Sequence, residues 1–395
     1  MARHRSKKKG ICSDSVSNSH DHAAESCEVI SKVLLSEDLM FYILTLVPIS
    51  CLINSARYVC KPWAATIASS LFVEMCENRA RSKPGLYVEN TTTSSSYFLE
   101  FKDGVNGQFE RTNLGTPQKM GHIISTCDGI LLLWNSFVDD IFVVNPLLKC
   151  WLRIPPLTIY GQHEFRCRPQ CAIVCVPGTI KFKLFIADIL YISSGCWHVF
   201  YVLRIGIDNS WREIARKEYP FQHYLWEPLY NGGNDLYWMT KIEVIVMDVD
   251  KEIILREYPL PQVPSGEDPT YLLMENRLSC IVCKDRDYKT YNIYILDFDS
   301  RKWSFYYQME LFDCVTACGH KLISSEAFRL WIDDQIIFRV ALRQNQSNIF
   351  QGFENMHFGY NVKTRQLTKI EDIDVGDFEV WLHANSLVSL SSAPP

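Results

Sequence analysis

The feature that most constrains this chain is a loose repeat in the long region after residue 84. Each copy holds a turn, an apolar strand, an alternating strand ending in Asn or Asp, a polar turn, and a large apolar residue. The clearest copy runs from Cys127-Asp-Gly-Ile-Leu-Leu-Leu-Trp134 through Ile141-Phe-Val-Val-Asn-Pro146 to Trp151. The final apolar anchors, at positions 151, 211, 258, 303 and 367, recur about every 54 residues. This period is close to the roughly 50 residues of a kelch blade.

The repeat predicts a β-propeller. A unit of this length holds four short strands, and such a small sheet buries both faces only by stacking radially on its neighbours. The region after residue 84 has room for about six kelch-like blades. A propeller ring must be closed, and we expect Asn385-Ser-Leu-Val-Ser-Leu390 to pair with an early strand near Leu86 to Glu89. A β-sandwich is the alternative fold, but it does not require the recurring order of the repeat.

The repeated tryptophans at positions 151, 211 and 303 are expected to lie in the cores of the blades rather than in a ligand site. Loops on one face of a propeller are free to vary, because the strands are committed to packing. The candidates for capture of a partner protein are four loops: Gln162 to Pro169, Gln222 to Trp226, Pro264 to Tyr271 and Arg343 to Phe350.

The region before the repeat has a helical pattern. Leu39, Ile43, Leu46 and Val47 fall near one face of a helix. Ser36 supplies an N-cap oxygen ahead of two acidic residues that the helix dipole favours, and Pro48 ends the helix. Two further helices are predicted, one near Cys51 to Tyr58 and one from Pro62 to about Arg79, with Pro62 in the first turn. Three such helices form a module too small to be very stable alone.

These patterns predict an α+β multidomain chain in three parts. Residues 1–33 form a disordered basic tail, residues 34–80 form the small three-helix module, and residues 81–395 form the all-β domain. The basic cluster from Arg3 to Lys9 is compatible with a nuclear-import signal or with plain solubilising charge. We expect the protein in the nucleus, the cytoplasm or both, because no apolar segment of a secretory signal follows the basic start.

Charge and hydropathy exclude two classes of partner. The formal net charge is -5. Residues 1–10 carry five basic side chains and no acidic one, which leaves -5 minus +5, or -10, on residues 11–395. An acidic body argues against nucleic acid as the ligand, because phosphate binding depends on clustered Lys and Arg. The longest apolar run, Leu39 to Ile53, contains Pro48 and is shorter than the about 20 residues of a membrane span. Protein partners are therefore favoured.

The cysteines predict buried thiols rather than disulfides, a metal site or a cofactor site. There are 15, spread through a large chain, many within apolar runs. Cys280-Ile-Val-Cys283 and Cys314 to Cys318 with His320 have the spacing of zinc ligands, but the first pair lies in a predicted strand, where alternate residues face opposite sides. Cys167, Cys171 and Cys175 are read as core thiols, and His20 and His22 as solvated.

Two parts of the sequence resemble a known family. Leu35-Ser-Glu-Asp-Leu39, Ile43-Leu44, Pro48, Leu52 and Arg57-Tyr-Val-Cys-Lys-Pro-Trp63 resemble an F-box. The following domain resembles the F-box-associated domain of plant-type F-box proteins, through Cys127-Asp-Gly-Ile-Leu, Asn145-Pro146, Trp151, Pro155 and Ser386-Leu-Val-Ser389. Together these resemblances span nearly all of residues 34–390. Ser36 and Val47 depart from the two Leu-Pro pairs of the F-box pattern and imply weaker or altered binding of the adaptor.

The resemblance implies a non-catalytic substrate receptor of an SCF-type cullin-RING ubiquitin ligase. The F-box would dock on a Skp-type adaptor, which brings the cullin and RING subunits, while the β domain holds an unknown substrate protein. The implied adaptor contacts are Leu35, Leu39, Ile43, Leu44, Pro48, Leu52, Val59 and Trp63, about half of which are expected to pack the helices together. Two alternatives stay open: a propeller-fold enzyme with convergent carboxylates or metal ligands at the central channel, and a ligase-independent interaction scaffold.

Overall fold

The computed structural model describes residues 37–79, 84–90, 92, 95–101, 109–112, 120–157, 169–193, 195–219, 225–261, 269–284, 290–311, 321–322, 327–343 and 354–390. The chain divides into two compact units, Met1–Met75 and Cys76–Pro395, here called the helical unit and the ring. The predicted tail, residues 1–33, lies outside the described residues. The division between the units falls inside the last helix, before the predicted boundary at residue 80.

The helical unit contains more helices than the three predicted. The structure has α2 (Glu37–Thr45), α3 (Ile49–Asn54), the 3-10 turn η1 (Ala56–Tyr58), α4 (Lys61–Ala68) and α5 (Ser70–Arg79). The predicted helix from Pro62 to Arg79 is broken at Ser69, whose backbone is extended. The Ser69 hydroxyl donates to the Thr66 carbonyl at 2.8 Å and accepts from the Phe72 amide at 3.3 Å. One serine thus caps both helices, because its side chain satisfies groups that each helix end leaves unpaired.

The two prolines of this unit act near the predicted positions. Pro62 lies in the first turn of α4, where its missing N–H costs nothing. Helix α2 ends at Thr45, and Pro48 is the residue before α3, with a φ of -53° and a ψ of 142°. Both prolines therefore set helix boundaries. None of the helices in the described segments is long and apolar enough to cross a membrane.

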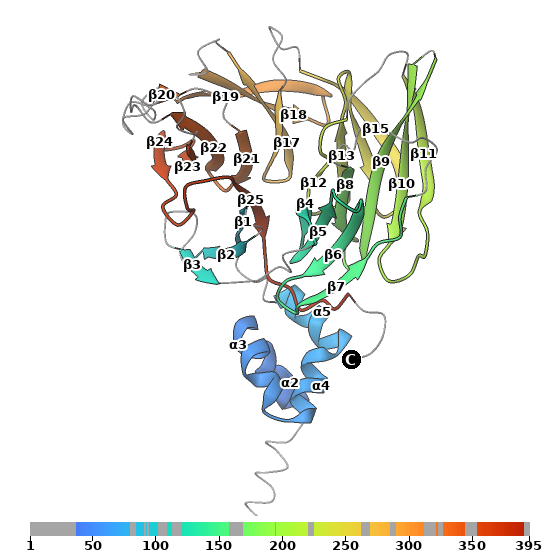
Figure 1. Ribbon diagram of the computed structural model, residues 1–395, viewed down its shortest axis with the longest axis vertical. Coiled ribbons are helices and arrows are strands. Elements are labelled where there is room, and N and C mark those ends of the chain that lie inside the picture. The colour runs from blue at the N-terminus through green and yellow to red at the C-terminus, as the bar shows by residue number, and fades with distance from the viewer. Residues whose placement is uncertain are drawn as a thin grey trace, which may run out of the picture. The chain divides into compact units, whose positions relative to one another are not determined.

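The ring is a six-bladed β-propeller (Figure 1). We number its sheets as blades 1 to 6 along the chain. Blade 1 has the order β25-β1-β2-β3, and blades 2 to 5 are β4–β7, β8–β11, β12–β15 and β16–β19, while blade 6 adds a fifth strand within β20–β24. All pairings between strands are antiparallel, as expected for up-and-down blades.

The first three blades are built from twelve strands. In blade 1 they are β25 (Phe378–His383), β1 (Gly85–Asn90), β2 (Ser96–Phe101) and β3 (Phe109–Thr112). In blade 2 they are β4 (His122–Cys127), β5 (Ile130–Asn135), β6 (Asp140–Asn145) and β7 (Cys150–Arg153). In blade 3 they are β8 (Gln170–Cys175), β9 (Phe182–Ile192), β10 (Gly195–Arg204) and β11 (Arg212–Tyr219).

The other three blades follow the same plan. Blade 4 has β12 (Leu229–Tyr230), β13 (Asp235–Met239), β14 (Glu243–Asp248) and β15 (Ile253–Pro259). Blade 5 has β16 (Thr270–Met274), β17 (Arg277–Cys283), β18 (Thr290–Asp297) and β19 (Lys302–Glu310). Blade 6 has β20 (Lys321–Leu322), β21 (Ala327–Ile332), β22 (Gln335–Arg343), β23 (Glu354–Asn361) and β24 (Gln366–Lys369).

The first strand of each sheet lies innermost, because these strands contact one another from blade to blade. Strand β4 contacts β8 and β25, and β21 contacts β16 and β25. The repeat anchors at positions 151, 258, 303 and 367 all lie on fourth, outer strands, and Trp211 directly precedes another. Each copy of the repeat therefore corresponds to one blade, which confirms the period and the predicted number of blades.

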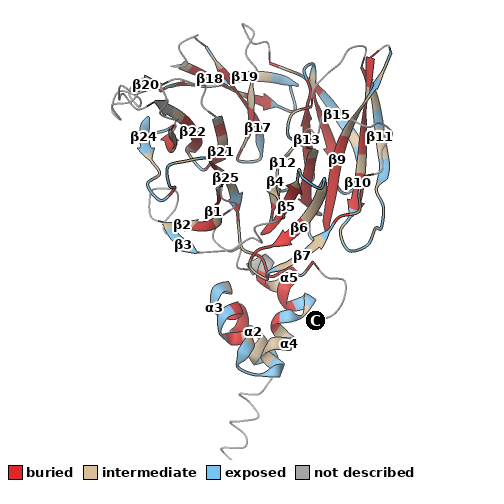
Figure 2. Cartoon of the chain, in the orientation of Figure 1, coloured by how far each residue is buried: buried red, intermediate tan, exposed pale blue. Residues whose placement is uncertain are grey.

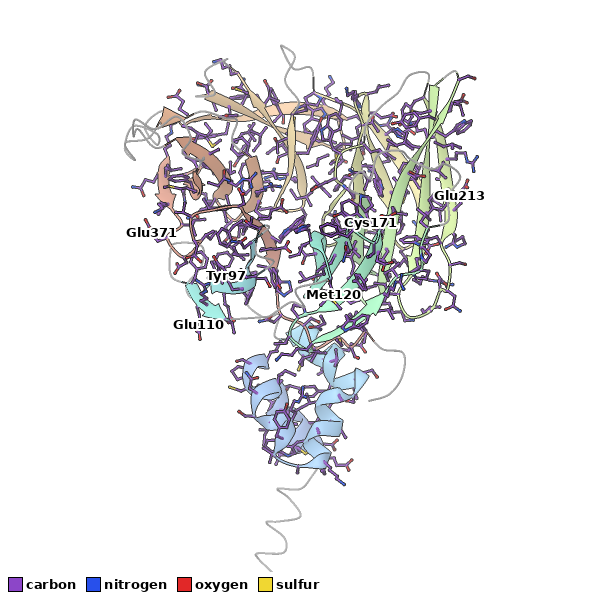
Figure 3. All side chains as sticks on the ribbon, viewed as in Figure 1. Tyr97, Glu110, Met120, Cys171, Glu213 and Glu371 are labelled. Carbon is purple, nitrogen blue, oxygen red and sulfur yellow. The ribbon has the colours of Figure 1, made fainter. Side chains whose placement is uncertain are left out.

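The core of the ring lies between blades. Each of five apolar clusters joins the facing sides of two neighbouring sheets, so both faces of blades 1, 4, 5 and 6 are covered. Figure 2 shows buried residues along the inner strands and exposed residues on outer strands such as β11. Cys171 on β8 lies within the ring and Glu213 on β11 at its rim (Figure 3). Radial stacking thus buries the small sheets, as the repeat predicts.

The ring closes through a different segment from the one predicted. Strand β25, residues 378–383, pairs with β1, with Gly85 opposite His383 and Asn90 opposite Phe378. The predicted closing strand, Asn385 to Leu390, lies beyond β25 and is not a strand. We call Ala384–Leu390 the strap. The Asn145 side-chain amide donates to the strap carbonyls of Ser386 at 3.0 Å and Val388 at 2.9 Å, so the strap is fastened to blade 2.

The predicted placement of the tryptophans is wrong for Trp151, whose surface is 53% exposed on the outer strand β7. The other two join neighbouring blades. The Trp211 indole N–H donates to the Pro155 carbonyl and the Trp303 indole N–H to the Pro259 carbonyl, both at 2.8 Å. In each case the proline follows or ends the outer strand of the preceding blade. The tryptophan thus packs at the rim and its polar edge finds a partner there.

Candidate functional site

The helical unit carries the predicted adaptor-binding residues, and the structure separates them into two groups. Leu44 and Leu52 are fully buried and pack the helices together with Ile53, Ala56, Ile67, Phe72 and Val73. The rings of Phe41 and Phe72 meet edge to face at 5.4 Å. Leu39, Ile43, Pro48 and Val59 are exposed, Trp63 is half-buried, and Leu35 lies outside the described residues. Two of the seven described residues are therefore buried, fewer than the half that was expected to pack the helices.

Exposed apolar side chains that the sequence analysis did not choose extend this group. They are Tyr42, Leu46, Tyr58 and Leu71, which are between 52% and 69% exposed. Residues 39, 42, 43 and 46 follow the spacing of neighbours on one face of a helix. We call Leu39, Tyr42, Ile43 and Leu46 the helical apolar face. The sequence pattern already placed Leu46 on this face, and the same periodicity could have added Tyr42, three residues after Leu39.

The two ends of the ring differ in how the strands are connected. In an up-and-down blade, the first and third turns lie at one end and the other connections at the opposite end. Turns at the first end are short, such as 128–129, 146–149, 275–276 and 298–301, and we call it the tight-turn end. At the opposite end the segments between blades are longer, such as 154–169 and 260–269, and we call it the loop end.

The tight-turn end is set by side chains that the repeat predicted. Asn145, Asp248, Asp297 and Asn361 end the third strands of blades 2, 4, 5 and 6. In each, Oδ1 accepts the amide hydrogen of the residue two positions later, at 3.0 Å. Four residues after each of these side chains the backbone becomes left-handed, at Lys149, Glu252, Arg301 and Arg365. Asn and Asp recur because their side chains form such turns locally.

The four loops predicted to capture a partner all connect strand ends at the loop end. Three precede the inner strands β8, β12 and β16, and the fourth joins β22 to β23. Most of their residues lie outside the described residues, and only the strand ends locate them. Exposed apolar side chains at the same end are Phe137, Val138, Tyr191, Ile242 and Val375. Topology thus brings the predicted loops to one face, which the linear sequence does not show.

The ring residues that carry the family resemblance are structural in this chain. A side chain at Gly129, whose φ is +79°, would bring a Cβ within 2.4 Å of the Ser386 Cβ in the strap. Asn145 holds the strap, and Pro155 accepts the hydrogen bond from Trp211. These residues of the resemblance motifs therefore contact the strap or connect neighbouring blades.

Thiol chemistry has no support from the described cysteines. Cys280 belongs to the apolar cluster between blades 4 and 5, whereas Cys283 packs against the cluster between blades 5 and 6. The two therefore face opposite sides of β17 and cannot share one metal ion. Burial raises the pKa of Cys171 and of Cys280, which keeps these thiols protonated. The pKa of Cys127 is also raised, by burial and by the charge of Asp128.

Within the described part of the chain, no group of three or more His, Cys, Asp or Glu side chains is placed to hold a metal ion. Six residues considered in the sequence analysis lie outside the described part of the chain: Cys167, Cys314, Cys318, His320, His20 and His22.

A buried carboxylate and a histidine meet where blade 1 contacts blade 2 at the loop end. Glu89 is 3% exposed, and its Oε2 accepts the Ile123 amide hydrogen at 3.1 Å. The Glu89 Oε1 lies 3.8 Å from the His122 Nδ1, and the His122 side chain is 43% exposed. The carboxylate mainly holds the inner strand β4 by its backbone.

Comparison with known proteins gives similarity of fold alone. No protein-family model matches the sequence, and no curated protein matches it. Among solved structures, a periplasmic gluconolactonase of Pseudomonas aeruginosa is 12% identical with a TM-score of 0.39, covering 76% of this chain and 99% of that one. A putative 6-phosphogluconolactonase of Bacteroides fragilis is 10% identical with a TM-score of 0.37, covering 77% and 99%. The Dos1 propeller is 9% identical with a TM-score of 0.37, covering 73% and 71%.

Proposed function

We propose that this protein is the substrate receptor of a cullin-RING ubiquitin ligase, in which the helical unit docks on a Skp-type adaptor and the ring holds the protein to be modified. The observation that carries the proposal is the helical apolar face. Its four side chains, Leu39, Tyr42, Ile43 and Leu46, are between 36% and 66% exposed on α2 and the residue that follows it. Contiguous exposed apolar side chains on a small helical unit are typical of a protein interface.

The arrangement of the helical unit supports a docking role over a catalytic one. Leu44 and Leu52 fill its interior, so the exposed leucines are not needed to build it. An amphipathic helix that presents residues at i, i+3, i+4 and i+7 offers the pattern by which helices pack against partner helices. The receptor would do no bond chemistry itself, and would act by raising the effective concentration of a substrate lysine near the conjugating enzyme.

The ring supports the second half of the proposal. Its tight-turn end is held by side-chain to backbone hydrogen bonds, while the connections between blades lie at the loop end. Rigid scaffolds that present variable loops at one face are suited to recognition. Substrate capture at the loop end would involve the connections before β8, β12 and β16 and between β22 and β23.

Affinity purification of the full-length chain from cells, followed by mass spectrometry, tests the proposal. The double substitution Leu39→Glu and Ile43→Glu should remove adaptor and cullin peptides, because it places two charges in the contact, while the ring stays folded. The matched control is Leu255→Glu, at an equally exposed leucine on the outer strand β15. Persistence of adaptor peptides in the double variant would refute adaptor docking through this face.

A purification that recovers no adaptor even with the unchanged chain would favour the ligase-independent scaffold. In that case the proteins recovered with the unchanged chain should still be lost from the double variant if the helical apolar face is their docking site. Substrate proteins are distinguished from the adaptor because they should be retained when residues 34–80 are deleted.

A further inference from the structure

The junction between blade 6 and blade 1 contains two polar side chains that the described part of the fold satisfies poorly. Arg339 on β22 lies directly opposite His357 on β23. Two residues from Arg339 on the same face of β22, Ile337 packs in the apolar cluster with Leu86 and Val88 of blade 1. Arg339 and His357 therefore face blade 1, beyond the apolar contact and toward the loop end.

Neither group makes a hydrogen bond of good geometry to the described residues. His357 is 2% exposed, and the Phe378 backbone lies near its ring, but neither ring nitrogen meets a described partner at full hydrogen-bond geometry. Arg339 is half-buried, and its guanidinium forms no hydrogen bond or ion pair with the residues that the structure describes. A guanidinium carries five donors and a neutral imidazole one donor and one acceptor. Buried polar groups are nearly always paired, so a neighbouring pair of side chains with so few good hydrogen bonds calls for a functional explanation.

Positive charge at this junction exceeds what the nearby acids neutralise at contact distance. Arg329, at the bulge of β21, lies 3.7 Å from Glu379. The other facing acid, Asp377, accepts a hydrogen bond from the Asn355 side-chain amide at 2.5 Å. Neither carboxylate contacts Arg339.

The protonation equilibria reflect the same imbalance. Burial and then the charge of Arg329 lower the pKa of Arg339, in spite of the attraction to Glu379 and Asp377. Burial, followed by the charges of Arg339 and Arg329, lowers the pKa of His357 to about 4, and the Phe378 backbone opposes this in part. At neutral pH the imidazole is therefore uncharged and keeps one N–H to donate.

We propose that Arg329, Arg339 and His357 form a binding site for an oxyanion, a carboxylate or phosphate group carried by an extended segment of a partner protein. The planar guanidinium of Arg339 can donate two parallel hydrogen bonds to such a group. An oxyanion between the two arginines would also reduce their mutual repulsion. The Arg329 side chain is 26% exposed, so the site is open to solvent.

The site lies at the loop end, the face that topology leaves for partner capture. The four charges that face the site sum to zero: Arg329, Arg339, Asp377 and Glu379. The site therefore attracts an anion only at contact distance, which selects an anionic group that can reach the Arg339 guanidinium. The inference is independent of adaptor docking, because it concerns the ring alone.

A titration of His357 in the full-length chain tests the site directly. Its imidazole resonance is followed by NMR and assigned with His357→Gln. Inorganic phosphate should raise the pKa of His357 by roughly one pH unit or more, because a bound anion offsets the two arginine charges. The rise should be absent in Arg339→Gln and retained in Arg277→Gln, a control at the tight-turn end. An equal rise in Arg339→Gln would overturn the proposal.

Capped pentapeptides identify the source of the oxyanion by isothermal titration calorimetry. Three peptides differ only in a central phosphoserine, glutamate or glutamine between glycines. The first two should bind, and Arg339→Gln should weaken them roughly tenfold or more, the usual effect of losing a hydrogen bond to a charged group. Arg339→Lys should recover part of the loss, because it keeps the charge without the planar fork.

The remaining outcomes also decide the matter. If free phosphate binds and neither peptide does, the ligand is a small free anion rather than a group on a partner protein. That result would overturn this part of the proposal. Thermal unfolding separates a structural role from a binding role. Removal of an unpaired half-buried charge in Arg339→Gln should leave the melting temperature in phosphate-free buffer unchanged or raise it, whereas a structural role requires a fall.

Discussion

The helical unit and the ring treat apolar side chains in opposite ways. In the ring, blades cover one another and the last strand, β25, completes the first blade, so the apolar clusters are enclosed. In the helical unit, Leu44 and Leu52 fill a small interior while Leu39, Tyr42, Ile43 and Leu46 remain exposed. A small unit has too much surface for its volume to bury every apolar residue.

The difference shows how one chain can contain both a ring with an enclosed core and a helical unit with an exposed apolar face. The ring gains stability from neighbour contacts repeated around a closed circle, which leaves its loops free for binding. The helical unit gains stability from few side chains and presents others outward. Substitutions that affect one unit without the other therefore test the comparison.

The largest effect should follow from removing the closure of the ring. A chain that ends at Gly376 lacks β25 and the strap, which exposes the inner edge of β1 and the clusters on both faces of blade 1. We expect loss of the cooperative thermal transition of the β signal in circular dichroism. A control chain that ends at Leu390 keeps both segments and should melt like the intact protein. A cooperative transition in the shorter chain would show that the ring does not depend on this closure.

Two leucines in one helix should separate core from surface in the helical unit. Leu44→Ala should lower the free energy of unfolding of that unit by about 2 to 5 kcal/mol, because it leaves a cavity in the interior. Leu39→Ala, at a side chain that is 36% exposed, should cost less than about 1 kcal/mol. Urea unfolding followed by the helical signal measures both. Similar losses would mean that the helical apolar face is part of the core.

Acid should destabilise the ring before the helical unit. Burial lowers the pKa of His383, between the rings of Tyr87 and Phe98, to about 3, and His357 is lowered to about 4. Both are neutral when folded, while the unfolded chain takes up protons below about pH 6.5. Stability is therefore complete above that pH and is lost as the pH falls toward 4. Each histidine should lower the free energy of unfolding of the ring by about 1 kcal/mol as the pH falls from 7 to 5.5.

The described residues of the helical unit contain no histidine, so it lacks this response. His383→Phe should reduce the loss of ring stability between pH 7 and 5.5, as measured by urea unfolding, and His122→Gln, at a half-exposed side chain, is the control. An unchanged dependence on pH in His383→Phe would contradict the assignment to this residue.

The smallest effect concerns the links between outer strands. Trp303→Phe keeps an aromatic ring but removes the N–H that donates to the Pro259 carbonyl at 2.8 Å. The ring should lose about 1 kcal/mol, the usual net value of one hydrogen bond, with no change in the helical unit. Trp151→Phe is a matched control, because Trp151 lies at the equivalent place in blade 2 and is largely exposed. Equal effects would show that packing, rather than this hydrogen bond, holds the rim.

Several errors of sequence interpretation have one physical cause. A sequence pattern specifies the local structure of a segment better than it specifies which distant segment that structure will contact. The apolar segment Asn385–Leu390 alternates like a strand, yet β25 precedes it and the strap binds blade 2 through Asn145. Ser69 has no periodic signature, and it ends one helix and starts the next by its two hydrogen bonds. Trp211 and Trp303 meet the preceding blade at the rim, whereas Trp151 is largely exposed there.

The sequence by itself determined the period of the blades, their number, the Asn and Asp turns and the helical periodicity, because these depend on residues that are close along the chain. Only the tertiary structure decided which strand closes the ring, which leucines face outward, and that Arg339 lies opposite His357 with no ion pair to the described residues. These depend on contacts between segments far apart in sequence, such as Asn145 with Ser386, and the free energy of such contacts is set by which surfaces the fold brings together.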